Sequence, residues 1–320
     1  MLIKTALSAL SPAGPRARLS ILIFHRVLDA PDPLFPDEVD RRRFDEIAGW
    51  LARWFNVLPL GDAVQRLVAG TLPSRAAAIT FDDGYADNWT NAVPILQRHG
   101  LSATFFIATG FLNGGRMWND TIIESVRRTN ATTLDLSQFG CGAWSIEGAE
   151  AKRAAIGRLL TRVKHLPFSQ RDEVVRFVPA VCGVELPTDL MMTDDQVVQM
   201  VASGMEVGAH TRSHPILTRL DDDLAAEEIL ASRQYLSTLL SRDIDLFAYP
   251  NGRQGDDFDA RHVRMVRELG FRAAVATNPG AATGEPDLYR LPRFTPWDRS
   301  RARFGVRIAF NLRTPLLPAP

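Results

Sequence analysis

The stretch AAAITFDDGYADN, residues 76–88, places an unbroken apolar run directly before two adjacent carboxylates. Polar and apolar residues do not alternate in residues 76–81, which is typical of a strand covered on both faces in a parallel sheet. Asp82 and Asp83 then stand at the carboxyl end of that strand, and Gly84 follows them. Because parallel α/β folds bind ligands at this end of their strands, the two acids are candidate functional residues.

Short apolar segments like this one recur along the chain and alternate with helical patterns. The other expected strands are residues 20–27, 56–60, 102–109, 205–211, 244–250, 271–277 and 288–294. A helix is predicted over residues 41–55, where apolar residues recur on one face. Thr193 and Gln196 have the spacing of a capping box that begins another helix. Strand and helix alternate often enough to predict a parallel sheet, and about eight strands favour a barrel over an open sheet.

Residues 111–190 break this rhythm, because a glycine-rich segment, a polar segment and two helical stretches replace the regular alternation. The helical stretches cover residues 149–165 and 167–178. We interpret the segment as an insertion on the loop face of the barrel, where barrels carry variable structure; a plain helical cover for the core is the alternative. The expected organisation is an N-terminal extension over 1–19, the barrel over 20–312 and a tail over 313–320.

Composition excludes several classes of protein. The chain has 320 residues, with 37 basic and 37 acidic side chains, so it lacks the basic surface of a nucleic-acid-binding protein. Two cysteines without a CxxC pair indicate neither a disulfide framework nor a thiolate zinc site. No segment is apolar over the roughly 18 to 20 residues of a membrane span. The apolar N-terminal stretch is broken by Pro12 and Pro15, so we expect a cytoplasmic protein, with an envelope-associated one as the alternative.

His210 ends the expected strand 205–211, and His214 follows four residues later. Two imidazoles at this spacing form a natural pair of metal ligands, and one carboxylate would complete a three-ligand site with positions left for water and substrate. Adjacent residues of a strand point to opposite faces, so one aspartate can bind the cation while the other takes a proton from water. Zinc is the first expectation, and cobalt, nickel or iron would also suit these ligands. The alternatives are two surface histidines and an Asx-type turn at the acids.

The two motifs together identify a family. TFDDG at residues 80–84, followed by HTRSH at 210–214, resembles the polysaccharide deacetylases of the nodulation-type homology domain, carbohydrate esterase family four. The resemblance extends over residues 22–297. It implies a deformed (β/α)7-type barrel and metal-dependent removal of N-acetyl or O-acetyl groups from sugars. It also implies that Asp82 is the catalytic base and that Asp83, His210 and His214 are the metal ligands.

Two departures from the family pattern concern the residues around the catalytic base. FAYPNG at 247–252 has Ala248 where the family has an arginine and Asn251 where it has a tyrosine. Arg293 is the suggested replacement for the arginine, and the Asn251 N–H can still bind an oxyanion. The last histidine, His262, lies in a helical pattern, so it is not expected to be the general acid. Instead, ILIFHRV resembles a permuted branch acting on poly-N-acetylglucosamine-type exopolysaccharides, which makes His25 the proton donor; a core-edge histidine paired with a carboxylate is the alternative.

Four residues are expected to bind substrate: Tyr249, Trp118, Trp297 and Arg293. Trp118 belongs to a Trp-Asn-Asp segment that resembles one in several bacterial deacetylases, and its ring would stack on a sugar. The predicted activity is metal-dependent removal of N-acetyl groups from a saccharide or an exopolysaccharide intermediate of the cell envelope. Hydrolysis of another linear or cyclic amide and a degenerate carbohydrate-binding module are the competing functions. Neither the sugar nor the oligomeric state is specified by the sequence.

Overall fold

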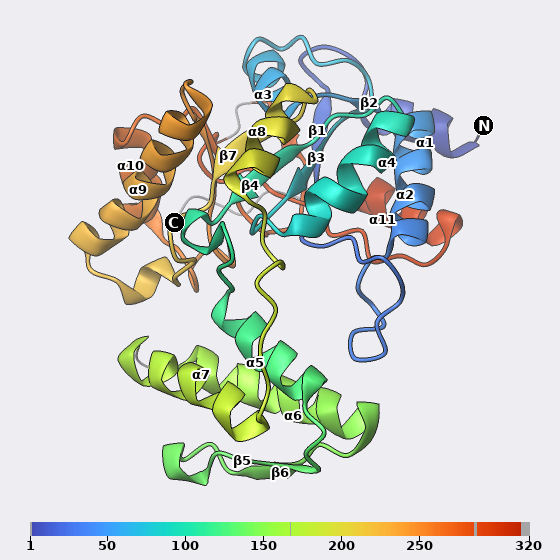
Figure 1. Ribbon diagram of the computed structural model, residues 1–320. Helices are drawn as coiled ribbons and strands as arrows, with labels where there is room; N and C mark the ends of the chain where they lie inside the picture. The colour runs from blue at the N-terminus through green and yellow to red at the C-terminus, as the bar shows by residue number, and fades with distance from the viewer. Residues whose placement is uncertain (1, 167, 285–286, 315–320) are drawn as a thin grey trace.

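The computed structural model describes residues 2–166, 168–284 and 287–314, and it shows a mixed α/β protein around one curled sheet (Figure 1). The strands of this sheet are β1 (Arg18–Phe24), β2 (Asn56–Val57), β3 (Ala76–Phe81), β4 (Thr104–Ile107), β7 (Glu206–Ala209), β8 (Leu246–Ala248), β9 (Ala273–Val275) and β10 (Ala282–Thr283). Their order is β10-β1-β3-β4-β7-β8-β9, and β2 pairs with β3. All pairs are parallel except β1 with β10. The parallel barrel-like sheet predicted from the sequence is confirmed.

The expected strand 288–294 is not a continuous strand, yet it joins β9, at one edge of the sheet, to β1, next to the other edge. The N–H of Leu291 donates to Ala274 of β9, while the N–H of Phe294 donates to Ile21 of β1. Single bridges, Val275 with Leu291 and Leu22 with Phe294, mark the same two contacts. Each contact covers only one register position, so no ladder forms, and the ring of hydrogen bonds is irregular here. This irregular closure is the deformation of the barrel.

Helices cover the outside of the sheet (Figure 1). They are α1 (Leu2–Leu10), α2 (Arg41–Trp54), α3 (Leu60–Val68), α4 (Val93–Arg98), α8 (Asp194–Ala202), α9 (Asp222–Leu240), α10 (Ala260–Glu268) and α11 (Arg301–Asn311). The helix expected over 41–55 is α2, which begins where the Asp40 side chain accepts the Arg43 N–H. The capping box of Thr193 and Gln196 is present at the start of α8. Among the described residues, no helix is both long and apolar enough to cross a membrane.

The N-terminal extension and the end of the chain pack on each other. Helix α1 contacts α11, and a Cβ atom at Gly305 would lie 2.8 Å from the Cδ1 of Ile3. A larger residue at this position would require the Ile3 side chain to move. Of the tail expected over 313–320, residues 315–320 lie outside the described part of the chain.

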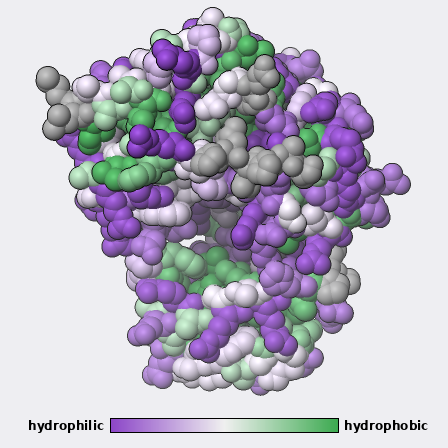
Figure 2. All heavy atoms as spheres, turned by 180° about the vertical axis from the view of Figure 1, so that it is seen from behind, coloured by the Kyte–Doolittle hydropathy of each residue, from purple (hydrophilic) through white to green (hydrophobic). Residues whose placement is uncertain are grey.

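Residues 118–182 form a separate group of elements beside the barrel (Figure 1). These are α5 (Trp118–Arg128), the hairpin of β5 (Thr133–Asp135) and β6 (Ala143–Ser145), α6 (Gly148–Lys164) and α7 (Phe168–Cys182). They enclose their own apolar cluster, which includes Ile122, Leu159 and Val178 as well as the free cysteines Cys141 and Cys182. Figure 2 shows a hollow between this group and the barrel. This segment has a core of its own. It therefore fits an insertion on the barrel better than a helical cover over the barrel core.

Candidate active site

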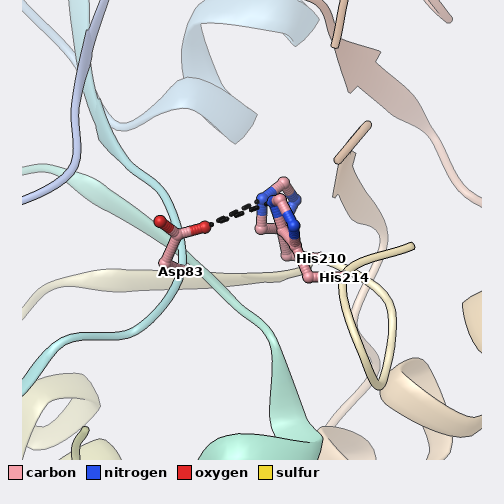
Figure 3. Close-up of side chains that lie close together, drawn as sticks. All are labelled: Asp83, His210 and His214. Carbon is pink, nitrogen blue, oxygen red and sulfur yellow. Dashed lines mark ion pairs between the residues drawn. The ribbon is translucent and has the colours of Figure 1, made fainter. Parts of the chain in front are cut away.

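Asp83, His210 and His214 converge at the carboxyl ends of β3 and β7 (Figure 3). The Nε2 atoms of both imidazoles lie 3.4 Å from Oδ1 of Asp83. One ligand atom from each residue lies within 4.8 Å of the other two. Asp83 Oδ1 is buried and has no hydrogen-bond partner among the described residues. An orphaned carboxylate oxygen that faces two imidazole nitrogens fits the donor set of a divalent cation.

Backbone conformation and neighbouring groups hold these three side chains in place. Asp83 and His214 adopt left-handed φ angles of 78° and 53°, a strained conformation that clusters at functional sites. The Nδ1 of His210 lies 2.7 Å from the Ala248 carbonyl oxygen, which directs its Nε2 towards Asp83. Glu228 of α9 accepts hydrogen bonds from the backbone N–H groups of Arg212 and Ser213. The HTRSH loop is therefore fixed from outside the site.

The protonation states of two of these residues suit cation binding. His210 differs, because burial lowers its pKa but the Asp83 and Asp82 carboxylates outweigh burial and raise it. Burial lowers the pKa of His214 to about 4, although the Asp83 carboxylate opposes this effect. Burial alone would raise the pKa of Asp83, but the imidazoles of His210 and His214 hold it well below its usual range. Near pH 7, His214 is thus neutral and Asp83 is ionised, which are the forms that bind metals.

Asp82 is not part of this cluster, because its carboxylate pairs with a different residue, Arg293. Both of its oxygens accept hydrogen bonds of 2.7 Å from the Arg293 guanidinium, which also donates to the carbonyl oxygen of Ala276. Burial acts to raise the pKa of Asp82, but the charges of Arg293 and His210 together with the hydrogen bonds from Arg293 outweigh it, so the pKa is lowered. Arg293 therefore takes the place of the arginine that the FAYPNG segment lacks. It lies in the segment 288–294, which joins β9 to β1 in space. The structure holds Asp82 ionised and fixed in orientation.

Two expected substrate contacts are buried and have partners within the protein. Arg293 is 1% exposed, and its guanidinium is paired with Asp82, so in this structure it positions a carboxylate. Tyr249 is fully buried, with its ring stacked on Phe258 at 3.8 Å and its hydroxyl donating to the Tyr289 carbonyl. The apolar ring faces the core because β8 is covered on both faces.

His25 is exposed directly after β1, and its side chain lines cavities together with Asp83. Three side chains that follow the DDG turn hold this strand end: Asn88 donates to the His25 carbonyl oxygen, Asn91 donates to that of Val27, and Asp87 accepts the Val27 N–H. Asn88 and Asn91 lie on a π-helix, Asn88–Ala92, an irregularity that is frequent at functional sites. These three residues were not among the expected site residues, although their close spacing after the acids was a signal.

A cavity of about 380 Å³ is lined by Asp83 and the two imidazoles together with Asp82, His25, Trp118 and Asn251. Lys164, at the end of α6, reaches it from the insertion and donates to the Oδ1 of Asn251 over 3.1 Å. The sequence offered no signal for Lys164, because one lysine in a polar helix is ordinary. Trp297 lies outside this cavity. It is 60% exposed and lines an adjoining cavity, with the Arg307 guanidinium 4.3 Å from its ring centre.

A parallel barrel with a buried acid–imidazole cluster and a guanidinium-held aspartate at its strand ends has the architecture of a hydrolase. Residues 69–136 and 154–274, more than half of the chain, match the polysaccharide deacetylase family model. The chain belongs to this family. It is also 21% identical over 279 residues to the Bacillus subtilis protein YxkH, which is named for the same family. That match covers 87% of this chain and 71% of YxkH.

Solved structures share the fold. The Streptococcus pyogenes deacetylase PplD, in complex with acetate, superposes with a TM-score of 0.59 at 20% identity, over 88% of this chain and 92% of PplD. IcaB from Ammonifex degensii has a TM-score of 0.59 at 19% identity, over 95% of this chain and 99% of its own. A de-N-acetylase from Aggregatibacter actinomycetemcomitans has a TM-score of 0.58 at 14% identity, covering 91% of this chain and 99% of the other. At these identities the likeness shows the fold alone.

Proposed function

We propose that the protein removes N-acetyl groups from an N-acetylglucosamine-type saccharide, with an exopolysaccharide or its precursor as the substrate class. Membership of the deacetylase family supports the reaction type. The observation that carries the proposal is the paired arrangement of Asp82 on Arg293 and Asp83 on two imidazoles within one cavity. Acetamide hydrolysis requires a group that holds the cation and a base that takes a proton from water. Asp83, beside the imidazoles, suits the first role, and Asp82, beside Arg293, suits the second.

Asp83, His210 and His214 would hold a divalent cation, with zinc as the first candidate and cobalt, nickel or iron as others. When bound, such a cation supplies Lewis-acid chemistry, polarising a carbonyl and making water more acidic. Asp82 is the base that takes the proton of the attacking water, because its partner Arg293 keeps it ionised and oriented.

Two further residues, Asn251 and His25, would bind the oxyanion and protonate the departing amine. Asn251 has a left-handed φ of 57°, and its side chain and carbonyl oxygen are held by Lys164 and Thr277. This fixes the backbone whose N–H would bind the developing oxyanion. His25 is exposed, lines the same cavity and is the candidate donor of a proton to the departing amine. The amine leaves as the free amino sugar, and acetate is the second product.

Acetate release from N-acetylglucosamine oligomers tests this function. The purified protein is assayed with zinc, after chelation, and with small cyclic imides as competing substrates. The matched variants are Asp82→Asn, which removes the base, and Asp62→Asn, which alters an exposed aspartate of α3. We expect acetate release by the zinc-loaded protein and the Asp62 variant, and a loss of at least about 100-fold in the Asp82 variant.

Two results would contradict the proposal. Turnover of cyclic imides without acetate release from oligomers would make the protein a hydrolase of another amide. Stoichiometric metal binding without turnover of any acetylated saccharide would indicate a carbohydrate-binding module.

A further inference from the structure

A second cavity, of about 600 Å³, adjoins the site and contains His25 and Asp83 in its wall. It lies between the segment after β1, residues 25–38, and helix α5 of the insertion. The two walls are tied together, because Arg127 of α5 pairs with Asp32, and Arg153 of α6 donates to the Leu34 carbonyl oxygen. Figure 1 shows the long loop after β1 reaching towards the insertion. The cavity is thus a defined space with one end at the reaction centre.

Asp120 of α5 gives this cavity an unused hydrogen-bonding group. The residue is 3% exposed, and its Oδ1 accepts a hydrogen bond of 3.3 Å from the Tyr85 hydroxyl. Its Oδ2 is buried without any partner in the described part of the chain. The neighbouring Asn119 has an Oδ1 in the same state, and both residues line the cavity. Buried oxygens without partners are costly, and a ligand donor would satisfy them.

Several charged groups beside Asp120 in the lining of this cavity already have partners, whereas Glu38 of the opposite wall has no ion pair among the described residues. Asp32 and Glu124 both pair with Arg127, and Arg26 pairs with Asp87. Asp120 differs from these acids, because no ion pair involves it among the residues described. The opposite wall adds the partly buried ring of Phe35. An aromatic ring in the wall opposite unpaired acceptor oxygens suits a sugar, which presents C–H groups on one side and hydroxyl groups at its edge.

We propose that this cavity is a saccharide subsite, in which Asp120 and Asn119 accept hydrogen bonds from the sugar unit next to the one that carries the reacting acetamide. The inference rests on the proposed function and narrows it: the substrate is a chain of at least two sugar units, and the insertion takes part in selecting it. The donor is a hydroxyl group or the free amino group of a unit that has already been deacetylated.

The test compares substrates of different length. Specificity constants, kcat/KM for acetate release, are measured for N-acetylglucosamine and its fully acetylated pentamer with zinc-loaded protein. The variants are Asp120→Ala, which removes the acceptor, and Ile123→Trp, which fills the cavity and keeps Asp120. Thr121→Ala on the same helix, outside both cavities, is the matched control. Thermal unfolding identifies any variant that fails to fold.

We expect wild type and the Thr121 variant to prefer the pentamer, and the pentamer-to-monomer ratio of kcat/KM to fall about tenfold or more in both cavity variants. An unchanged ratio in a folded Ile123→Trp variant would overturn the subsite. A partially deacetylated pentamer distinguishes the two donors, because preference for it over the acetylated one would assign the amino group. If no saccharide is turned over, pentamer binding is measured by calorimetry; equal affinity of wild type and both cavity variants would overturn the subsite independently of the catalytic proposal.

Discussion

Replacement of Arg293 by methionine tests the pairing at the centre of the site. In the native protein the guanidinium makes two hydrogen bonds to Asp82 and others to Ala276 and Thr80. Methionine keeps much of the side-chain volume and leaves a buried carboxylate without its partner. Removing one member of a buried ion pair typically costs about 3–5 kcal/mol. We therefore expect the free energy of unfolding at pH 7 to fall by about that amount.

The pH dependence follows from the direction of the pKa shift. The pKa of Asp82 is lowered in the folded protein, so the stabilisation by its charged form is present above its ordinary pKa of about 4 and is lost as the pH falls below that value. In the variant, burial is no longer opposed by the guanidinium and raises the pKa. The stability difference between wild type and variant should therefore shrink in acid, and the acid limb of the variant's kcat/KM profile should move to higher pH.

Urea unfolding from pH 3 to 8 and acetate release from pH 5 to 9 measure the two effects. Arg66→Met is the matched control, because Arg66 pairs with Asp62 on the surface of α3 and such exposed pairs contribute about 0–1 kcal/mol. If Arg293→Met costs no more than this control, or if its acid limb does not move, Arg293 does not hold Asp82 in its charged form.

Three further substitutions test individual side chains. His214→Gln should reduce the bound divalent cation, measured by elemental analysis after dialysis, about tenfold or more, and retention of one ion per chain would remove His214 from the ligands. His25→Gln should lower kcat for acetate release by about 10²–10⁴-fold with little change in KM if this residue is the proton donor; an unchanged kcat would exclude it. Tyr249→Phe should leave kcat/KM within about twofold and lower stability by about 1 kcal/mol, because its hydroxyl only donates to the carbonyl oxygen of the partly buried Tyr289. A large rise in KM would restore Tyr249 as a substrate contact.

Local patterns in the sequence predicted much of the scaffold. The unbroken apolar run before Asp82 specifies a strand covered on both faces, and β3 is buried along its whole length. The apolar face of residues 41–55 and the capping box at Thr193 specify helices that begin where α2 and α8 begin. These features depend on residues only a few positions apart, so they can be predicted from the sequence alone. The position of Asp83 and His210 at strand ends was predictable for the same reason, because parallel strands meet at one edge.

Only the tertiary structure decided which distant groups meet. Arg293 and Asp82 are 211 positions apart, and Lys164 reaches Asn251 from a different group of elements. Tyr249 shows the converse, because a residue at a strand end can still turn its ring into the core. No local pattern encodes such contacts. They arise from the curvature of the sheet and the docking of the insertion, which are set by many small packing contributions summed over the whole chain.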